Sequence, residues 1–453
     1  MTDNTQKSKS KARVLSGMRP TGRLHIGHYF GALSNWLKMQ DEYDCFYFVA
    51  DWHALTTHYA DSSQVASNTL EVATDWLAVG LDPAKATLFI QSSVPEHAEL
   101  HLLLSMITPL SWLERVPTYK EQIENLRDKD LGTYGFLGYP LLQGADIVMY
   151  GEPGQELLVP VGEDQAPHIE MTREIVRRFN VMFGLDLDDG ILLPANRTHL
   201  CALEEKVSQS KYYQSYLSDL ADPNEAPSTS RSKMLSRVRS HAAEVGIQNF
   251  LNSLGPEKKF IRVTEPLVEP DVKLTETPRV PGTDGRRMAK SYGNAIWLSD
   301  TPEEIRAKTR NMMTDPQRVR RTDPGRPEVC PVFAYHNLFP EKKSAEDCAR
   351  IERVDRECRT AEIGCVDCKK LMADALVKWI EPIQARRAKY EASPREVWDV
   401  LEDGSKRAKK VAEQTMERVR KAVFNWEGAG RVGVAPGEGK GKVAAAKPII
   451  SDE

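Results

Sequence analysis

The chain has 453 residues, a formal net charge of −4 and 41% hydrophobic residues. This length exceeds the ~100–200 residues of a typical domain, so we expect more than one domain, with sizeable cores. The near-neutral charge excludes a global basic field, and an RNA partner would need a local basic patch. No apolar run approaches the ~20 residues of a membrane span. The Ser/Lys-rich start lacks the apolar core of a secretory signal, so we expect a cytoplasmic protein that does not contact a membrane.

The first recognisable unit is a short apolar strand that leads through the Gly/Pro turn 17–22 into a helix with apolar periodicity over 29–39. The free N–H groups and partial positive charge of such a helix N-terminus attract phosphate. His25 and His28 lie three residues apart on the first turn, so both can face one ligand. Gly27 between them leaves room for a flat base to approach the backbone.

Apolar strands and amphipathic helices then alternate along the chain. Strands are expected at 45–50, 87–91 and 157–161, and helices at 65–79, 97–107 and 169–180. This alternation predicts an α/β fold, a Rossmann-like doubly wound parallel sheet with helices on both faces. His53 follows the first of these strands, at the carboxyl end where open α/β sheets bind ligands.

Two polar residues, Gln143 and Asp146, interrupt an apolar helix expected over 139–150. A buried carboxylate is costly unless donors hydrogen-bond to it. The residues alone favour a solvated edge of the helix, and a pocket-lining acid that accepts an N–H group is the alternative. The turn Gly-Glu-Asp-Gln at 162–165 is, by itself, compatible with ordinary helix capping.

The second half of the chain contains a Gly/Pro-rich loop over 278–294 that we expect to be mobile. Helical patterns follow it as far as residue 427. The segments 1–11 and 428–453 are expected to be disordered tails, because the first is polar and the second is rich in Gly, Ala and Pro.

Two of these segments resemble the signature motifs of class I aminoacyl-tRNA synthetases. His-Ile-Gly-His at 25–28 has the pattern of the first motif, and Arg-Met-Ala-Lys-Ser at 287–291 resembles the Lys-Met-Ser-Lys-Ser loop. The helix with Asp146 and the Gly-Glu-Asp-Gln turn at 162–165 are similar to those of tryptophanyl-tRNA synthetases. Because the four motifs occur in family order over 15–294, the chain resembles the bacterial type of that family.

The resemblance implies a tryptophan–tRNA ligase. Such an enzyme converts L-tryptophan and ATP, with Mg²⁺, into tryptophanyl-adenylate and pyrophosphate, and then charges tRNA(Trp). It implies a homodimer and catalytic roles for His25, His28 and Lys290, with Lys290 on the pyrophosphate. Two alternatives stay open, a tyrosyl-tRNA synthetase and a catalytically inactive, synthetase-like RNA-binding protein.

Further site residues follow from the same resemblance. Those implied for ATP are Arg19, Pro20, Thr21, Gly27, His28, Gly162, Glu163, Asp164, Val280, Arg287, Met288, Ala289, Lys290 and Ser291. Those implied for tryptophan are Gly17, His53, Tyr139, Gln143, Asp146, Val159, Val161 and Gln165. In the family the acid at Asp146 accepts the indole N–H. The chain departs from the family at Arg287 and Ala289, where Lys and Ser are usual, and at Gln143, where many bacterial members have Met.

Motifs and resemblance together divide the chain into domains. A catalytic domain over 12–183 and 271–300 is interrupted by an insertion of unknown role over 184–270, and a helical anticodon-binding domain follows over 301–427. The insertion carries basic residues that could meet RNA, although a solvated charged face is the default interpretation. These residues are Lys206, Lys211, Arg231, Lys233, Arg237 and Arg239.

Seven cysteines in a cytoplasmic protein indicate thiols or metal ligands instead of disulfides. Four lie within one helical region, as Cys330 and the motif Cys358-x6-Cys365-x2-Cys368. Four thiolates suit zinc or an iron–sulfur cluster. A subset of tryptophanyl-tRNA synthetases carries a [4Fe–4S] cluster at such a motif, which makes the cluster the first expectation and zinc the alternative. Cys348 competes with Cys330 as first ligand, and Cys330 is preferred.

Overall fold

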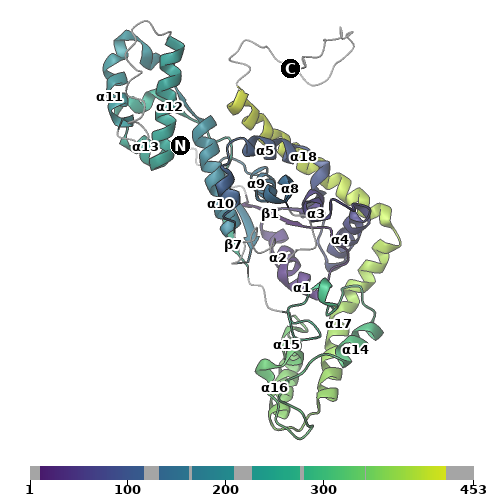
Figure 1. Ribbon diagram of the computed structural model, residues 1–453. Helices are drawn as coiled ribbons and strands as arrows, with labels where there is room; N and C mark the ends of the chain where they lie inside the picture. The colour runs from purple at the N-terminus through teal and green to yellow at the C-terminus, as the bar shows by residue number, and fades with distance from the viewer. Residues whose placement is uncertain are drawn as a thin grey trace, which may run out of the picture.

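The computed structural model describes residues 11–116, 132–162, 166–208, 227–275, 280–341 and 343–424, with side chains left out at 58 and 227–230. Its centre is a five-stranded parallel sheet of order β3-β2-β1-β4-β7 (Figure 1). The strands are β1 Arg13–Met18, β2 Asp44–Val49, β3 Ala86–Ile90, β4 Leu157–Val161 and β7 Asp271–Leu274. The predicted Rossmann-like parallel sheet is confirmed. Strand order reverses between β1 and β4, and ligands bind at such a switch point.

Alternate residues of the strands supply two separate cores, one on each face of the sheet. On one face Val14 and Tyr47 pack with the helices that follow β1 and β2. On the other face Leu15, Phe46 and Phe89 pack with the helices that follow β3 and β4. Because successive strand residues point to opposite faces, the continuous apolar runs seen in the sequence are explained by burial on both sides.

The helices around the sheet occupy most of the predicted positions. They are α1 Ile26–His28, α2 Ser34–Glu42, α3 Asp51–His58, α4 Val65–Val79, α5 Glu96–Ser105, α6 Leu110–Leu113, α8 Tyr134–Leu137, α9 Tyr139–Val148 and α10 Ala166–Phe179. A π-helical turn over Tyr29–Leu33 joins α1 to α2, so the first helix begins at the histidine motif. Shorter 3₁₀ and π turns occur at Gln91–Ser93, Asn180–Gly184, Asp189–Leu192, Pro194–Asn196, Pro256–Phe260, Lys290–Tyr292 and Pro327–Val329.

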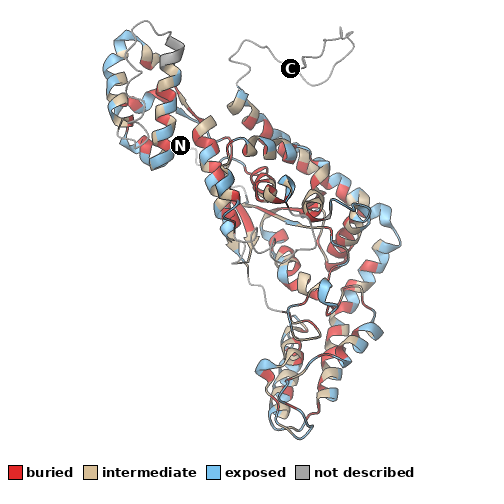
Figure 2. Ribbon diagram, in the orientation of Figure 1, coloured by how far each residue is buried: buried red, intermediate tan, exposed pale blue. Residues whose placement is uncertain are grey.

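The region 184–270 contains a helical unit that projects from the end of α10 (Figure 1). It consists of the antiparallel pair β5 Leu185–Leu187 and β6 Ile261–Val263, with α11 Arg197–Val207, α12 Pro227–Val245 and α13 Ile247–Ser253. Its own core is built from residues such as Leu203, Val238 and Phe250. Figure 2 shows the buried residues of these helices facing one another. This unit therefore carries a separate hydrophobic core.

Several basic side chains of this unit are engaged inside it. Arg231 pairs with Asp186 and Asp189, and Arg237 pairs with Glu204. Lys206 pairs with Glu257 at 3.1 Å, and Arg239 donates to the Leu185 carbonyl at 3.0 Å. Lys211 lies outside the described residues. These contacts give the four side chains structural partners and favour the interpretation that does not involve RNA.

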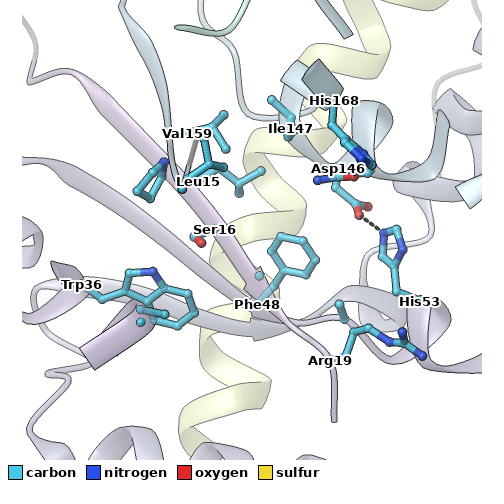
Figure 3. A pocket seen from close by; sticks show the side chains of 18 of the residues that line it. Leu15, Ser16, Arg19, Trp36, Phe48, His53, Asp146, Ile147, Val159 and His168 are labelled. Atoms are coloured by element: carbon cyan, nitrogen blue, oxygen red, sulfur yellow. Dashed lines mark hydrogen bonds and ion pairs between the residues drawn. The ribbon is translucent and has the colours of Figure 1, made fainter. Parts of the chain in front are cut away.

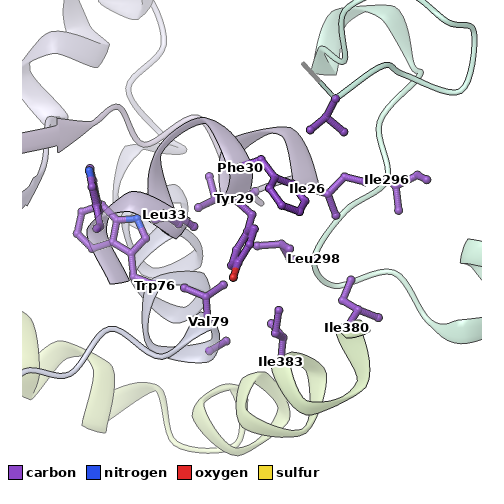
Figure 4. Packing of buried hydrophobic residues seen from close by; sticks show 14 of the residues in the cluster. Ile26, Tyr29, Phe30, Leu33, Trp76, Val79, Ile296, Leu298, Ile380 and Ile383 are labelled. Atoms are coloured by element: carbon purple, nitrogen blue, oxygen red, sulfur yellow. The ribbon is translucent and has the colours of Figure 1, made fainter. Parts of the chain in front are cut away.

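The C-terminal part is helical, as predicted. It comprises α14 Pro302–Arg310, α15 Pro331–Leu338, α16 Ala345–Arg359, α17 Cys365–Glu391 and α18 Pro394–Phe424. Helix α17 packs on α4 and carries Ile380 and Ile383 to the first helix, beside Ile26 and Tyr29 (Figure 4). None of the described helices is both long and apolar enough to cross a bilayer.

Helix α18 returns to the parallel sheet, although it lies in the range expected to bind the anticodon. It covers the edge strand β3 so closely that the carbonyl oxygen of Leu88 fills the space a side chain at Gly404 would need. The Ile90 N–H donates to Ser405 Oγ at 3.3 Å. Because an uncovered edge strand invites pairing with other chains, this helix closes the sheet on that side.

Candidate active site

A cavity of about 430 Å³ opens where β1 and β4 end, at the switch point of the sheet (Figure 3). The residues expected for tryptophan that line it are Gly17, His53, Tyr139, Gln143, Asp146, Val159 and Val161. Gln165 lies outside the described residues, as do Glu163 and Asp164. Gly162 and Arg19 also line this cavity. The fold thus brings these predicted tryptophan-site residues, which come from four elements, to a single cavity.

Asp146 is the charged centre of the cavity, with 1% of its surface exposed. Its carboxylate accepts hydrogen bonds from Gln91 Nε2 at 2.8 and 2.9 Å. His53 Nε2 lies 2.8 Å from Asp146 Oδ2, and His97 Nδ1 lies 2.6 Å from Oδ1. The interpretation of Asp146 as part of a solvated helix edge is therefore wrong, and the pocket-lining alternative holds.

The Asp146 carboxylate already has three side-chain hydrogen-bond partners, Gln91, His53 and His97. Burial alone would raise the pKa of Asp146, yet the hydrogen bonds from His53 and His97 bring it below its ordinary value. His97 Nε2 continues the chain to the Tyr150 hydroxyl at 2.7 Å. Asp146 is thus a carboxylate at neutral pH, and a ligand N–H would be added to this network.

The sequence did not reveal Gln91 and His97 as site residues. Gln91 is the last residue of the predicted strand and His97 is the first residue of the predicted helix, and no motif surrounds either. His168, which lines the cavity, was also not assigned, and its Nδ1 lies 3.2 Å from Gln143 Oε1. This contact orients the Gln143 amide, so the group that replaces the family Met is held at the cavity wall.

The first motif is tightly folded around its two imidazoles. The backbone N–H of His25 donates to His28 Nδ1 at 3.1 Å, which leaves the proton of a neutral His28 ring on Nε2. The two rings stack with centroids 3.7 Å apart. A Cβ at Gly27 would lie 2.9 Å from His25 Nδ1, so the ring of His25 occupies the space that we expected a base to use.

Both histidines of the motif should stay neutral well below pH 6. Burial, with Lys290 nearby, lowers the pKa of His25 to about 4. Burial, with His25 and Lys290 nearby, lowers the pKa of His28 to about 3. The unfolded chain binds these protons near pH 6.5, so folding stability should fall as the pH drops from about 6.5 toward these values.

The measurement is an NMR titration of ¹⁵N-histidine-labelled protein, with His25→Asn and His28→Asn used for assignment. We expect imidazole signals that stay in the neutral form down to pH 5. An unshifted pKa near 6.5 for either ring would contradict the described burial.

The second motif closes on the first. Lys290 Nζ donates to the carbonyls of Thr21 and Gly22 at 2.7 and 3.0 Å, although Thr21 lies 269 residues away in sequence. Met288 lies against Gly27, with its Cβ 3.6 Å from where a Gly27 Cβ would be. The two segments also pair through the backbone, because the Ile26 N–H donates to the Ile296 carbonyl at 3.0 Å. The predicted pair of motifs therefore forms one site.

The loop itself is organised by a buried residue that carried no signal in the sequence, Asn294. Its amide accepts from the Ala289 N–H at 2.9 Å and donates to Asp284 and to the Arg287 carbonyl. Val280 is buried at the base of the loop, whereas Arg287 and Ser291 are exposed. The backbone bond at Ala289 forms without the hydroxyl that the family usually has there.

Two cationic side chains, Arg19 and Lys290, lie near the end of the cavity that adjoins the two motifs. Arg19 donates to Thr57 Oγ1 at 2.5 Å, and its buried Nε has no hydrogen-bond partner among the described residues. Burial lowers the pKa of Arg19. Pro20, next to it, is buried in the turn that Lys290 contacts. Two cations beside a helix N-terminus make this end of the cavity suited to an anionic ligand.

The four predicted cysteines come together from three helices. Cys330 precedes α15, Cys358 lies near the end of α16, and Cys365 and Cys368 lie in the first turn of α17. Burial, and then the other three thiols, raise the pKa of Cys368 to about 12. Cys348 is exposed. Among the described residues, however, no three His, Cys, Asp or Glu side chains are arranged to hold a metal ion.

A parallel sheet with paired His-Ile-Gly-His and Lys-Ser motifs at its switch point defines the fold of a class I aminoacyl-tRNA synthetase. The chain belongs to the family described as "tRNA synthetases class I (W and Y)", which matches residues 6–234 and 247–381. A protein of Ralstonia nicotianae named tryptophan–tRNA ligase is 46% identical, over 91% of this chain and 98% of that one. A protein of Thermotoga maritima with the same name is 43% identical over the same shares.

Solved structures agree on the fold. The tryptophanyl-tRNA synthetase from Campylobacter jejuni, complexed with ADP and tryptophan, superposes with a TM-score of 0.64. It is 24% identical in sequence, and the match covers 90% of this chain and 98% of that one. The likeness extends beyond the sheet to the helical C-terminal part.

Proposed function

We propose that this protein is a tryptophan–tRNA ligase, which activates L-tryptophan with ATP and transfers it to tRNA(Trp). The observation that carries the proposal is the contact of Lys290 with Thr21 and Gly22 beside a cavity that holds a buried carboxylate, Asp146. The curated relatives named tryptophan–tRNA ligase match nearly their whole length, which favours tryptophan over tyrosine.

In the activation step the carboxylate oxygen of tryptophan attacks the α-phosphorus of ATP. A new oxygen–phosphorus bond forms, the bond to the bridging oxygen breaks, and pyrophosphate leaves with that electron pair. The nucleophile is already ionised, so no protein base is needed, and catalysis rests on positioning and on stabilising phosphate charge. Arg19, Lys290 and the helix start at His25 and His28 supply that stabilisation here, and Mg²⁺ enters with ATP.

The cavity gives each end of tryptophan a different environment. Tyr139, Val159 and Val161 provide apolar walls for the indole, and the ionised Asp146 is the acceptor for its N–H. At the other end, Arg19 and the closed loop with Lys290 face the phosphates. In this arrangement the substrate carboxylate lies between the indole pocket and the nucleotide, as the reaction requires.

The test is amino-acid-dependent exchange between ATP and labelled pyrophosphate. We expect exchange with tryptophan, little with tyrosine and none without an amino acid. Exchange that depends on tyrosine would establish the tyrosyl alternative, and absence of exchange with either amino acid would support the inactive RNA-binding alternative. Charging of tRNA(Trp) transcripts with labelled tryptophan checks the second step.

For the cysteines we propose that Cys330, Cys358, Cys365 and Cys368 bind a [4Fe–4S] cluster, with zinc as the alternative. The donor chemistry fits, because four thiols gather at the starts of two helices and near the end of a third, and Arg318 Nη1 lies 3.6 Å from Cys358 Sγ. The side chains would have to move to converge on a metal. Iron, sulfide and zinc analysis of protein purified without oxygen decides between the two, and Cys368→Ser should lose the metal. Metal-free protein would refute both.

We further propose that the protein is cytoplasmic and that the helical domain 301–427 contributes to binding of the anticodon arm. We also propose that the chain forms a homodimer. Five large apolar side chains on or next to helices α3, α5, α6 and α8 are more than half exposed, namely Tyr59, Leu102, Met106, Leu110 and Tyr134. A patch of this kind marks an interface between chains. Light scattering should give twice the chain mass, and Met106→Glu should shift it toward the monomer. A monomeric wild-type protein would exclude the dimer.

A further inference from the structure

The backbone just before the histidine motif is held from two sides. On one side, the Leu298 N–H donates to the Leu24 carbonyl at 2.9 Å, so this segment pairs with the chain that follows the Lys290 loop. On the other side, the Leu24 N–H donates to Asp75 Oδ2 at 2.7 Å. Asp75 lies on α4 and is 1% exposed. The position of His25 therefore depends on where this carboxylate is held.

Asp75 is held in turn by Arg387 of α17. Arg387 Nη1 donates to Asp75 Oδ1, and its Nη2 donates to Glu71 Oε2 at 2.5 Å. Glu391 Oε1 lies 3.1 Å from the same Nη2 atom. Only 2% of Arg387 is exposed. A buried charge is costly unless it is paired and hydrogen-bonded, so Asp75 and Arg387, the two buried members, each require the other to stay in place.

The same group also influences the second motif electrostatically. Burial lowers the pKa of Lys290 to about 8, and the Asp75 carboxylate lies near enough to oppose that shift. Helix α17 also packs next to the first motif, because its Trp379 ring lies edge-on to Tyr29 with centroids 4.8 Å apart, and Ile380 and Ile383 belong to the same core cluster (Figure 4). One buried ion pair thus lies close to both segments that would contact ATP, and it joins α4, through Asp75, to α17, through Arg387.

We infer that Asp75 and Arg387 are positioning residues for the activation step, which fix His25 and His28 against Lys290 and join that geometry to helix α17. This rests on the proposed function. Besides pairing with Arg387, Asp75 accepts a hydrogen bond from the backbone N–H of Leu24, directly before the motif. Through the Leu24 N–H, a displaced Asp75 moves the nucleotide end of the site and leaves the indole cavity around Asp146 in place.

The test compares Arg387→Met with a second variant at a more exposed ion pair, Arg420→Met. Arg420 also joins a C-terminal helix to the catalytic domain, through Glu99 on α5, but far from the motif in sequence and fold. Steady-state exchange should show a fall of about tenfold or more in kcat/KM for ATP in Arg387→Met, because a misplacement of about 1 Å can cost about 10²-fold. Tryptophan affinity from calorimetry should change less than about twofold in both variants.

Arg387→Lys keeps the charge but not the two-sided contact, and should recover part of the loss. Asp75→Asn, which has nearly the same shape, should show the same loss toward ATP if Arg387→Met does not fold. Equal losses for ATP and tryptophan, or folded variants with unchanged ATP parameters, would overturn the inference. Wild-type protein without any exchange would instead overturn the proposed function.

Discussion

Lys290→Ala is expected to slow adenylate formation by about 10²- to 10³-fold, the usual effect of removing one group that stabilises transition-state charge. In the structure the ammonium lies against the carbonyls of Thr21 and Gly22, at the turn that precedes His25. In the mechanism that we propose, pyrophosphate would develop its charge next to this ammonium group. Pyrophosphate exchange measures the rate, and calorimetry should show tryptophan affinity little changed.

The pH dependence of kcat/KM for ATP tests the charge of Lys290 separately from the shape of its side chain. Burial lowers its pKa to about 8, so the cation is lost as the pH rises through about 8 and kcat/KM for ATP should fall on that side. Lys290→Arg keeps its charge and should move this alkaline limb upward, at a lower maximal rate. Exchange unaltered by Lys290→Ala would refute the role in full.

Asp146→Ala is expected to weaken tryptophan binding by about 10- to 100-fold, since a hydrogen bond to a charged group contributes roughly 1.5–3 kcal/mol. ATP affinity should stay nearly constant, because the carboxylate lies in the part of the cavity that we propose for the indole. The substitution also leaves Gln91, His53 and His97 without their shared acceptor. A lower melting temperature is therefore expected as well.

Asp146→Asn provides the control for this destabilisation. The amide keeps the shape and one acceptor oxygen, but loses the charge, so we expect intermediate tryptophan affinity with a smaller loss of stability. Calorimetry on both variants, at a temperature where both are folded, measures the two affinities. Equal losses for tryptophan and ATP would exclude a specific role in indole recognition.

The sequence alone was sufficient for features that depend on neighbouring residues. Apolar runs predicted the parallel strands, because period and burial are local properties. The spacing of His25 and His28 predicted a shared ligand face, and Lys290 was found because its motif is short and contiguous. Resemblance then supplied the wall residues Val159 and Val161, which the cavity contains.

Tertiary structure alone decided which side chains share a hydrogen bond across long sequence distances. Gln91 and His97 reach Asp146 only because β3 and α5 fold beside α9, and no local pattern encodes that meeting. The same holds for Arg387, whose partner Asp75 lies 312 residues earlier. The local pattern of residue types predicts whether each segment forms a helix, a strand or a turn. The partner of a buried charge is chosen by packing, because only the folded chain removes the water that would otherwise solvate it.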